Sequence, residues 1–467
     1  MSRAAFSAAM TEMVDQVARE HLLRHDRQED ICFALWYPSR GRSRYTGLVK
    51  TLVLPLDGER NVHGNASFNP AYLERAMAEA MANDAGLALM HSHPFGTGWQ
   101  SMSDDDVIAE QGTAGAVYGA TGLPFLGLTM GGDGAWSARF WQRVGPRTYA
   151  RDWCSTVRVV GNSLKVSFNE QLAPRPRSSE KLIRTVSAWG EQAHADLTRL
   201  RVAVVGAGSV GGFIAEGLAR TGFEDIMLID FDRIEKHNLD RLMYALARHV
   251  GKLKVQILRQ RLKLCATAEI VRVEALNCAV FEETGFRAAL DSDVIVCCVD
   301  RPWGRHVLNQ IAYAHLIPVI DGGISVRANK HDQLVAADWK AHTATFGRPC
   351  LQCLRQYDPG LVQMEREGRL DDPHYIEALP RGHTLKAREN VFAFSMSCAS
   401  LQMLQLLALT LSPLDQPNPG SQLYHFVGGF MEKPTFGACT DDCLFPGLIA
   451  KGDRNGFKLT GNSLSLR

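Results

Sequence analysis

The spacing of apolar and polar residues gives the first part of the chain the pattern of strands with a helix between them. Residues 30–56 carry β-type apolar runs around a Gly/Ser/Pro turn, and residues 70–83 place apolar side chains at helical spacing. Strand-like runs follow at LALM, just before His91, and at GLPFLGLTMGG and WSARFWQRV. We therefore predict an α+β domain over residues 1–150.

A different pattern begins after residue 180. The short β-rich runs RVAVV, DIMLI, VIVCC and PVI alternate with helical stretches. This alternation predicts βαβ units on a parallel sheet, and hence a Rossmann-like, doubly wound α/β domain over residues 179–467. Residues 151–178 are predicted to be a linker, because the segment QLAPRPRSSEK at residues 171–181 combines proline, serine and charge.

Composition narrows the class of protein. With 467 residues, of which 46% are hydrophobic and 22% charged, the chain is typical of a globular protein, and low-complexity scaffolds are excluded. The 51 basic and 50 acidic residues give a formal charge of +1, so we expect neither nucleic acid nor membrane as a partner. The sequence opens without a signal-peptide pattern and has no run of 18 apolar residues, which predicts a cytoplasmic protein.

Residue types that bind metals cluster around His91 and His93. One residue separates the two histidines. Seven residues then separate His93 from Ser101, and two more separate Ser101 from Asp104. Two imidazoles on one strand face and a carboxylate from the next turn can fill three positions around Zn²⁺ and leave the fourth for water. A nearby carboxylate would act as general base, with Glu29 as the candidate and Asp30 as the fallback. The alternative is structural, with Asp104 capping a helix that begins at SDDD.

The pattern His-X-His-X7-Ser-X2-Asp resembles the JAMM signature of the JAB/MPN+ metal-dependent isopeptidases. The resemblance implies that His91, His93 and Asp104 bind a catalytic zinc ion. It also implies that Glu29 acts on the water and that Ser101 helps to hold the oxyanion. The alternative is a catalytically inactive JAB domain that serves as a docking surface for ubiquitin-like proteins.

A glycine-rich loop opens the second half of the chain. Gly206-X-Gly208-X2-Gly211 follows a strand and begins a helix, which allows backbone N–H groups to approach phosphate. About 20 residues later, Asp230 ends the next strand, where a carboxylate can bind ribose, and an NAD-dependent dehydrogenase fits this far. The polar residues that follow are better suited to a triphosphate with Mg²⁺: Asn238, Arg241, Lys254, Asp300 and Arg305.

The series GAGSVGG, DFDRIEKHNLDR, GKLK, CVDRPWGR and DGG resembles the ThiF/MoeB and ubiquitin-activating (E1-like) adenylyltransferase family over about residues 184–430. The resemblance implies ATP and Mg²⁺ as cofactors and a homodimer in which Arg184 reaches the partner's site. It implies these roles for the other residues: Asp230 on the ribose, Asp300 on magnesium, and Asn238, Arg241 and Lys254 on the phosphates, with Asp232 and Arg305 completing the nucleotide site.

The 11 cysteines are an odd number and argue against a secreted disulfide framework, so we read them as core residues and metal ligands. Cys350-X2-Cys353 and Cys439-X3-Cys443 form two pairs that can bind one structural Zn²⁺. The catalytic cysteine expected of ubiquitin-activating enzymes is absent from residues 354–397. Cys398 follows in an apolar helical pattern, which favours a core residue over a thioester-forming one.

Together, the two resemblances point to prokaryotic ubiquitin-like modification operons, in which fused JAB and activating domains occur, often in antiviral defence. The implied enzyme adenylates the C-terminal glycine of a ubiquitin-like (β-grasp) protein and cleaves after the same glycine, with a conjugating-enzyme-like protein as a further partner. A second hypothesis is activation of a sulfur carrier for thiamine, molybdopterin or cysteine synthesis, with the JAB unit trimming the carrier. A third treats both halves as non-enzymatic scaffolds.

Overall fold

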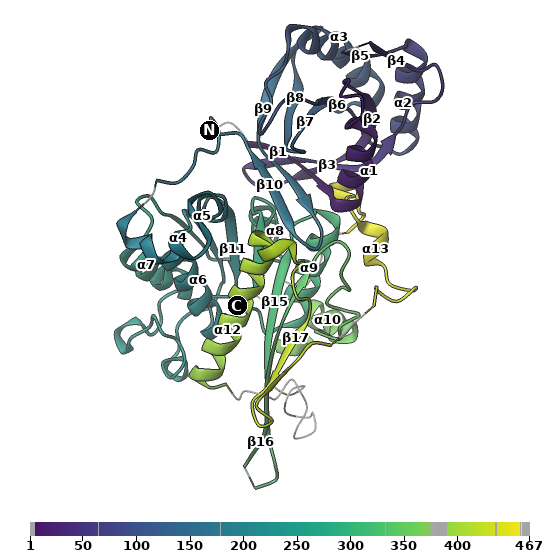
Figure 1. The fold of residues 1–467 in the computed structure, drawn as a ribbon. Helices are drawn as coiled ribbons and strands as arrows, with labels where there is room; N and C mark the ends of the chain where they lie inside the picture. Colours follow the sequence, from purple (N-terminus) through teal and green to yellow (C-terminus); the bar gives the residue numbers. More distant parts are fainter. Residues whose placement is uncertain are drawn as a thin grey trace. The chain divides into compact units, whose positions relative to one another are not determined.

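The chain forms two compact units, which are described separately (Figure 1). The computed structural model describes residues 5–457 except 64, 178, 332, 372–373, 375–376, 378–389 and 435–436, and it also describes residue 459. The first unit comprises Met1–Arg175, Ala314–Leu316 and Gly447–Gly456. The second comprises Pro176–Tyr313, Ile317–Pro446 and Phe457–Arg467.

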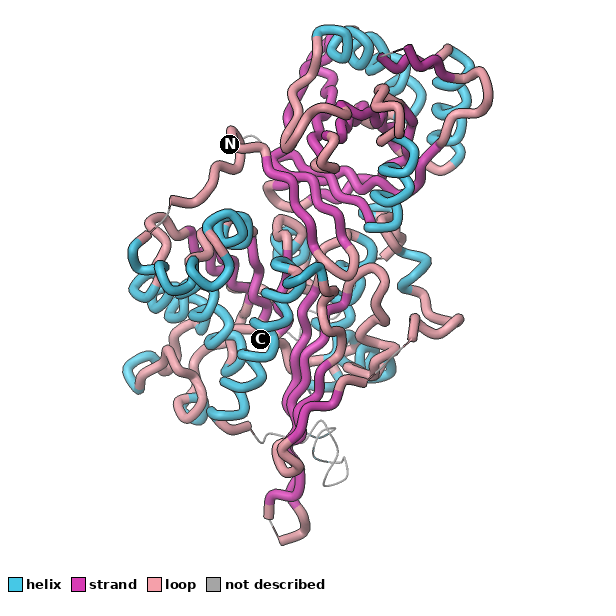
Figure 2. Tube along the Cα trace, viewed as in Figure 1, coloured by secondary structure: helices cyan, strands magenta, loops and turns pink. Residues whose placement is uncertain are grey.

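The first unit is built around one mixed sheet. Within the described residues this sheet has eight strands in the order β1-β3-β2-β6-β7-β8-β9-β10. Strand β1 also pairs with β9, so the sheet curves back on itself (Figure 2). The strands of the first unit, including the separate hairpin β4–β5, are β1 (Ala5–Thr11), β2 (Ile31–Arg40), β3 (Arg44–Val53), β4 (Arg60–His63), β5 (Asn65–Phe68), β6 (Gly86–His93), β7 (Phe125–Gly131), β8 (Trp136–Gly145), β9 (Thr148–Val160) and β10 (Leu164–Phe168).

Strand β2 shows how the sequence gives this sheet a core on each face. Successive side chains of a strand point to opposite faces. Accordingly, Cys32, Ala34 and Trp36 lie in one buried cluster, which includes residues of α1 (Glu12–Leu22). The intervening residues Ile31, Phe33, Leu35 and Tyr37 lie in a second cluster with residues of α2 (Pro70–Ala82) and α3 (Asp104–Thr121). A strand buried on both faces needs an uninterrupted apolar run, and ICFALWY supplies it.

The first unit extends further along the chain than we predicted from sequence. Strands β9 and β10 carry its sheet to Phe168, so most of residues 151–178 is not a linker. The reason is that β9 pairs with three strands, β8, β1 and β10, and such pairing between distant segments is not visible in the local sequence. A later segment, Gly447–Gly456, also belongs to this unit: the Arg40 backbone N–H donates to Asp453 Oδ2 at 3.0 Å, and Gly452 lies against Pro38 of β2.

The second unit contains the predicted Rossmann-like sheet. Its described strands lie in the order β13-β12-β11-β14-β15-β16-β17-β18, and the pairs from β13 to β15 are parallel, whereas those from β15 to β18 are antiparallel. The strands are β11 (Arg201–Val205), β12 (Asp225–Ile229), β13 (Arg272–Leu276), β14 (Val294–Cys297), β15 (Val319–Ala328), β16 (Leu334–Ala344), β17 (Gln422–His425) and β18 (Phe430–Glu432).

The order of the parallel strands predicts where a ligand-binding crevice lies in the second unit. The first strand of this unit, β11, lies between β12 and β14, so the chain winds outward in one direction and then in the other. In such sheets, ligands bind beyond the carboxyl ends of the strands where the winding reverses. Here that point lies between β11 and β14.

Helices cover the second sheet. The helices of this unit are α4 (Ile183–Trp189), α5 (Glu191–Thr198), α6 (Ser209–Thr221), α7 (Lys254–Cys265), α8 (Glu283–Ala289), α9 (Pro302–Ala314, whose last residue clusters with the first unit), α10 (Pro359–Arg366) and α12 (Phe392–Leu411), while α13 (Phe445–Leu448) spans the boundary. Helix α12 is long and apolar enough to cross a membrane by length and composition alone. It packs on α6, β15 and β16, as the core helix of a folded domain does.

Candidate functional sites

One candidate metal centre lies at the end of β6. His91 and His93 are two residues apart on this strand, so their side chains project from the same face. Asp106, the third residue of α3, places Oδ1 3.5 Å from His91 Nε2 and Oδ2 3.4 Å from His93 Nε2. The potential ligand atoms of the three residues lie within 4.8 Å of one another. Two imidazoles and one carboxylate suit a zinc site with one open position.

The carboxylate that faces the histidines is Asp106, and the prediction of Asp104 was wrong. Asp104 is the exposed first residue of α3, and Ser101 is exposed in the preceding loop. Ser103 caps the helix instead: its hydroxyl accepts the Asp106 N–H at 3.1 Å, and Asp106 Oδ2 accepts the Ser103 N–H at 2.9 Å. This reciprocal capping box fixes the first turn of α3 and with it the Asp106 carboxylate.

The electrostatics of this cluster favour a cation. Hydrogen bonding to Asp106 raises the pKa of His93, against the effect of burial. Burial acts to raise the pKa of Asp106, but the two neighbouring imidazoles lower it well below its usual range. Asp106 therefore carries its charge, as a metal-binding carboxylate must, and a metal ion would displace the proton that the raised pKa favours on His93.

Glu29 lies in the same pocket as His91 and Asp106, and its action as a general base stays a prediction. With His91 and Asp106 it lines a pocket of about 240 Å³, whose apolar wall includes Ile31, Phe68 and Leu89. Burial raises the pKa of Glu29, opposed by the two histidines. The fallback residue, Asp30, has a structural role instead: it is 1% exposed and pairs with Arg60 at 3.1 Å and Arg24 at 3.3 Å.

The choice between Asp106 and Asp104 can be tested directly. We expect Asp106→Asn to weaken binding of Zn²⁺ at this centre by about 100-fold or more, because changes outside the ligand set already cost 10–100-fold. Asp104→Asn should leave the affinity unchanged, since Asp104 is exposed. The measurement is zinc titration of both full-length variants against a chelator. Equal affinities would mean that the carboxylate has been assigned wrongly.

A second candidate site lies at the carboxyl ends of β11, β12 and β14. Gly206 follows β11 with φ +98°, and a Cβ there would lie 2.5 Å from Cys298 O. Gly208 is the N-cap of α6, and a Cβ at Gly211 would lie 1.9 Å from Gly206 O. Glycine is therefore required at Gly206 by both backbone conformation and space, and at Gly211 by space. The loop leaves N–H groups at the start of α6 available for phosphate.

Asp230 braces this loop from the neighbouring strand. Its Oδ2 accepts the Ala207 N–H at 2.7 Å, and its Oδ1 accepts the Asp232 N–H at 2.7 Å. Burial raises the pKa of Asp230, while Lys254 acts to lower it. A carboxylate oxygen can accept more than one hydrogen bond, so the predicted contact with ribose is compatible with this brace.

Lys254 interacts with the acidic residues that follow β12 and β14. It begins α7, and its Nζ lies 2.7 Å from Asp232 Oδ2, with 12% of the side chain exposed. Burial acts to lower the pKa of Lys254, but the carboxylates of Asp230, Asp232 and Asp300 together raise it. Asp300 is exposed just beyond β14. The structure thus brings together residues that are up to 70 positions apart in the chain.

Asn238 and Arg241 lie in the segment after β12. Asn238 Oδ1 accepts the Glu235 N–H at 3.0 Å, and Arg241 Nη1 donates to His237 O at 2.8 Å. These contacts order the segment on the same side of the sheet as Lys254. Their binding to phosphate remains a prediction.

Arg305 has a different role from the predicted one. Its Nε donates to Asp321 Oδ1 at 3.0 Å and its Nη2 donates to Gly322 O at 2.9 Å. Both side chains are buried, with 14% of Arg305 and 1% of Asp321 exposed. Arg305 therefore ties α9 to the start of β15, because its fork is already occupied by protein acceptors.

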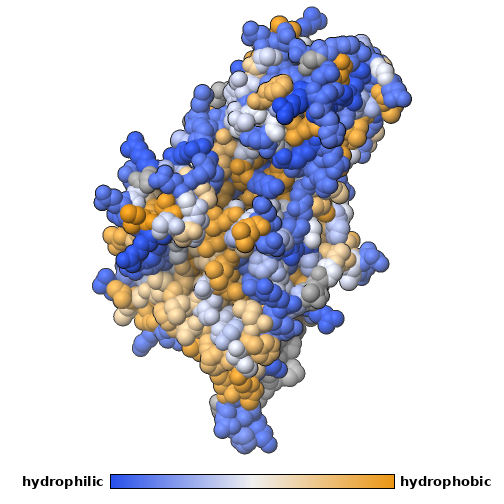
Figure 3. Space-filling model, in the orientation of Figure 1, coloured by the Kyte–Doolittle hydropathy of each residue, from blue (hydrophilic) through white to orange (hydrophobic). Residues whose placement is uncertain are grey.

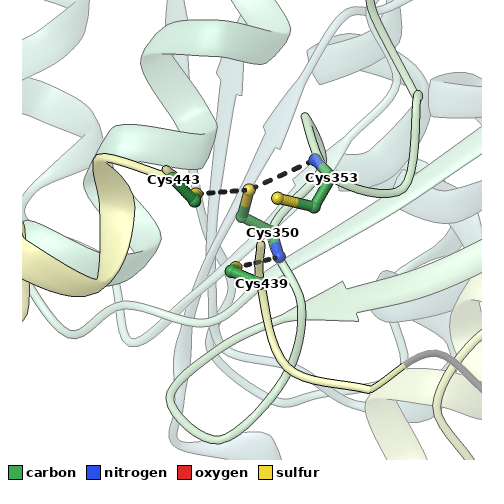
Figure 4. A group of neighbouring side chains, drawn as sticks. All are labelled: Cys350, Cys353, Cys439 and Cys443. Atoms are coloured by element: carbon green, nitrogen blue, oxygen red, sulfur yellow. Dashed lines mark hydrogen bonds between the residues drawn. The ribbon is translucent and has the colours of Figure 1, made fainter. Parts of the chain in front are cut away.

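Four cysteines from two distant segments meet in the second unit (Figure 4). Their sulfur atoms lie within 4.8 Å of one another, and Cys350 Sγ is 3.7 Å from Cys443 Sγ. A tetrahedron with zinc–sulfur bonds of 2.3 Å has edges of about 3.8 Å. The backbone N–H of Cys353 donates to Cys350 Sγ at 3.4 Å, and that of Cys350 donates to Cys439 Sγ at 3.2 Å. This geometry can hold one structural Zn²⁺, despite the three-residue spacing of the second pair.

Comparison with known proteins identifies the second unit. The ThiF family matches residues 180–439, which is more than half of the chain.

The chain belongs to the ThiF family.

Its similarity to individual ThiF-family proteins is confined to part of each. It is 31% identical over 154 residues to tRNA threonylcarbamoyladenosine dehydratase 2 of Saccharomyces cerevisiae, covering 32% of this chain and 34% of that protein. It is 29% identical over 177 residues to the sulfur carrier protein adenylyltransferase of Thermus thermophilus, covering 37% and 62% respectively. The structure of Escherichia coli MccB with ATP matches with 16% identity and a TM-score of 0.43, over 57% of this chain and 74% of that one. The chain thus spans only about a third of the first curated relatives that it matches.

Two further residues of the ThiF-family unit were singled out from sequence. Arg184 is exposed on α4, so its predicted contribution to a partner's site needs a second subunit. Cys398 is fully buried in α12, within an apolar cluster that includes Trp339 and Phe394. Burial raises the pKa of its thiol to about 12. Its assignment as a core residue is confirmed.

Proposed function

We propose that the ThiF-family unit uses ATP and Mg²⁺ to adenylate the C-terminal carboxylate of a ubiquitin-like protein. The observation that carries this proposal is the convergence of the Gly206–Gly211 loop, Lys254 and Asp300 where the sheet reverses its winding. A carboxylate oxygen of the substrate would attack the α-phosphorus of ATP, forming an acyl-adenylate and releasing pyrophosphate. Lys254 would offset charge on the phosphates, and Asp300 would hold Mg²⁺.

The surface of the second unit suits a protein substrate. On the face shown in Figure 3, apolar residues gather over the part of this unit that carries α12 and the antiparallel strands. Exposed apolar side chains of these elements and of the turn after β17 include Met396 (50% exposed), Leu404 (56%) and Val427 (63%). Exposed apolar groups of this kind favour contact with another folded protein. A second copy of the chain, with Arg184 reaching its neighbour's nucleotide, completes the proposed assembly.

For the first unit we propose a JAB/MPN-type zinc peptidase that cleaves after the same C-terminal glycine. His91, His93 and Asp106 would hold the ion. Bound Zn²⁺ lowers the pKa of water and polarises a carbonyl. Glu29, in the pocket beside these ligands, would accept a proton from the attacking water and pass it to the leaving amine. Both units would then act on one substrate terminus, one activating it and the other exposing or releasing it.

Two assays test these activities separately. The first is exchange of pyrophosphate into ATP, which should depend on a small β-grasp protein ending in glycine and should cease when that terminal carboxylate is amidated. The second is cleavage of a C-terminal fusion of the same protein, which should be lost on metal removal and restored by Zn²⁺. Absence of exchange with every β-grasp protein encoded beside the gene would contradict the first proposal. Cleavage that survives chelation would contradict the second.

A second candidate function is activation of a sulfur carrier. It is favoured by the absence of cysteine from residues 354–397 and by the burial of Cys398, because both remove a nucleophile for a thioester. The similarity to the Thermus thermophilus adenylyltransferase points the same way. Intact mass spectrometry of the β-grasp protein after reaction separates the two functions: a thiocarboxylate formed with a sulfur donor supports the sulfur carrier, whereas attachment to amines supports modification.

A further inference from the structure

A buried ion pair lies directly behind the candidate metal centre. Arg139 of β8 and Glu110 of α3 are both fully buried. Arg139 Nε donates to Glu110 Oε2 at 2.9 Å, and its Nη2 donates to Glu110 Oε1. Trp141 Nε1 donates to the same carboxylate at 2.7 Å. Three directed hydrogen bonds thus hold one side chain of α3 against the sheet.

This ion pair is connected to two of the three metal-binding residues. Glu110 lies four residues after Asp106, one helical turn along α3, so fixing Glu110 fixes the turn that carries Asp106. On the other side, Arg139 Nη1 donates to Thr129 Oγ1, which lies 3.2 Å from His91 Nε2. Thr129 thereby joins the ion pair to β7, the strand next to the one that carries His91. Its hydroxyl cannot donate to His91 Nε2 once that nitrogen's lone pair holds a metal ion, so its contribution comes through its bond to Arg139. Thr129 is also the register partner of His91 on β7.

A glycine makes room for this arrangement. Gly127 of β7 is the register partner of Arg139, and a Cβ at this position would lie 2.4 Å from Glu110 Oε2 and 2.5 Å from Arg139 Nε. The ion pair therefore occupies the space that a side chain of β7 would take. A larger residue at position 127 would have to displace the Glu110 and Arg139 side chains.

We propose that Glu110, Arg139 and Thr129 are positioning residues that hold Asp106 and His91 at metal-binding distance. The inference rests on the proposed metal centre of the first unit. A buried ion pair contributes little net stability compared with apolar residues of similar volume, but its hydrogen bonds are directional. Here the directed bonds join the helix that supplies one ligand to the sheet that supplies another.

The decisive variant removes both charges together. Glu110→Gln with Arg139→Met keeps an acceptor for Trp141 and leaves no buried charge unpaired. We expect it to remain folded, with thermal unfolding of the metal-free protein close to that of the wild type, but to bind Zn²⁺ at this centre 10–100-fold more weakly. Thr129→Val should act in the same direction, and Thr129→Ser should restore the wild-type affinity. Thr46→Val is the control, since the Thr46 hydroxyl bonds Ser7 at 2.7 Å, outside the chain of contacts that leads to His91.

Zinc stoichiometry separates the two metal sites in the full-length protein. The four-cysteine cluster should fill first, and the second equivalent should report on His91, His93 and Asp106. A His91→Ala/His93→Ala variant defines loss of that second equivalent, and the visible spectrum of Co²⁺ in its place reports ligand geometry independently of activity. If the wild type binds only one equivalent, the metal centre itself fails. If it binds two and Glu110→Gln/Arg139→Met binds both equally tightly, only the positioning role is overturned.

Discussion

Glu29→Gln is expected to slow cleavage of a C-terminal fusion by about 10²–10⁴-fold, the contribution of a positioned general base. Glutamine has nearly the same shape as glutamate but cannot accept the proton of the attacking water. Because Glu29 lies in the pocket beside His91 and Asp106 but is not one of the three ligands, the zinc content should be unchanged. The measurement is the cleavage rate under single-turnover conditions, together with zinc content.

Glu74→Gln is the matched control, since Glu74 is an exposed residue of α2 in the same unit. It should cleave at the wild-type rate, and both variants should retain pyrophosphate exchange by the second unit. If Glu29→Gln cleaves normally, the general base has been assigned wrongly. If it loses zinc as well as activity, Glu29 is a ligand and not a base.

Lys254→Ala is expected to reduce ATP–pyrophosphate exchange by about 10²–10³-fold, equivalent to about 2.7–4 kcal/mol of lost transition-state stabilisation. Lys254 interacts with Asp230, Asp232 and Asp300, so its removal takes a positive charge from beside the proposed phosphates. Asp300→Ala should have a comparable effect through loss of Mg²⁺. The measurement is exchange at saturating ATP and β-grasp protein.

Lys263→Ala controls for the loss of a lysine from the same helix, because Lys263 is exposed in the last turn of α7. Loss of the ion pair with Asp232, which is 51% exposed, should change the unfolding free energy by less than about 1 kcal/mol. A large drop in stability would mean that reduced exchange reports unfolding. Unchanged exchange in both Lys254→Ala and Asp300→Ala would move the nucleotide site elsewhere.

The architecture of the second unit could be predicted from sequence because local and long-range signals agree there. Gly206 and Gly211 must be glycine for reasons of backbone conformation and space, so the loop is visible in the sequence. The ends of β12 and β14 are marked by Asp230 and Asp300, which follow continuous apolar runs. Parallel strands must carry such residues at one edge of the sheet.

The residues that were assigned wrongly depend on contacts that sequence does not encode locally. The segment SMSDDD contains two overlapping Ser-X2-Asp patterns, Ser101 with Asp104 and Ser103 with Asp106, and either could cap the helix. Only the packing of α3 against the sheet decides between them, and that packing includes the contact of Glu110 with Arg139 of β8. Arg305 was predicted to bind the nucleotide because it lies in the motif CVDRPWGR, whereas its contact with Asp321 of β15 is visible only in the folded chain.

The assignment of Gly447–Gly456 to the first unit has a consequence for biosynthesis. During translation, the sheet around Arg40 and Pro38 emerges from the ribosome long before the segment that lies against it. Most of the second unit, Pro176–Tyr313 and Ile317–Pro446, must be synthesised in between. Until that segment has been synthesised, the nascent chain carries a complete Gly206–Gly211 loop but an unfinished first unit, and incompletely folded units of this kind are what chaperones bind.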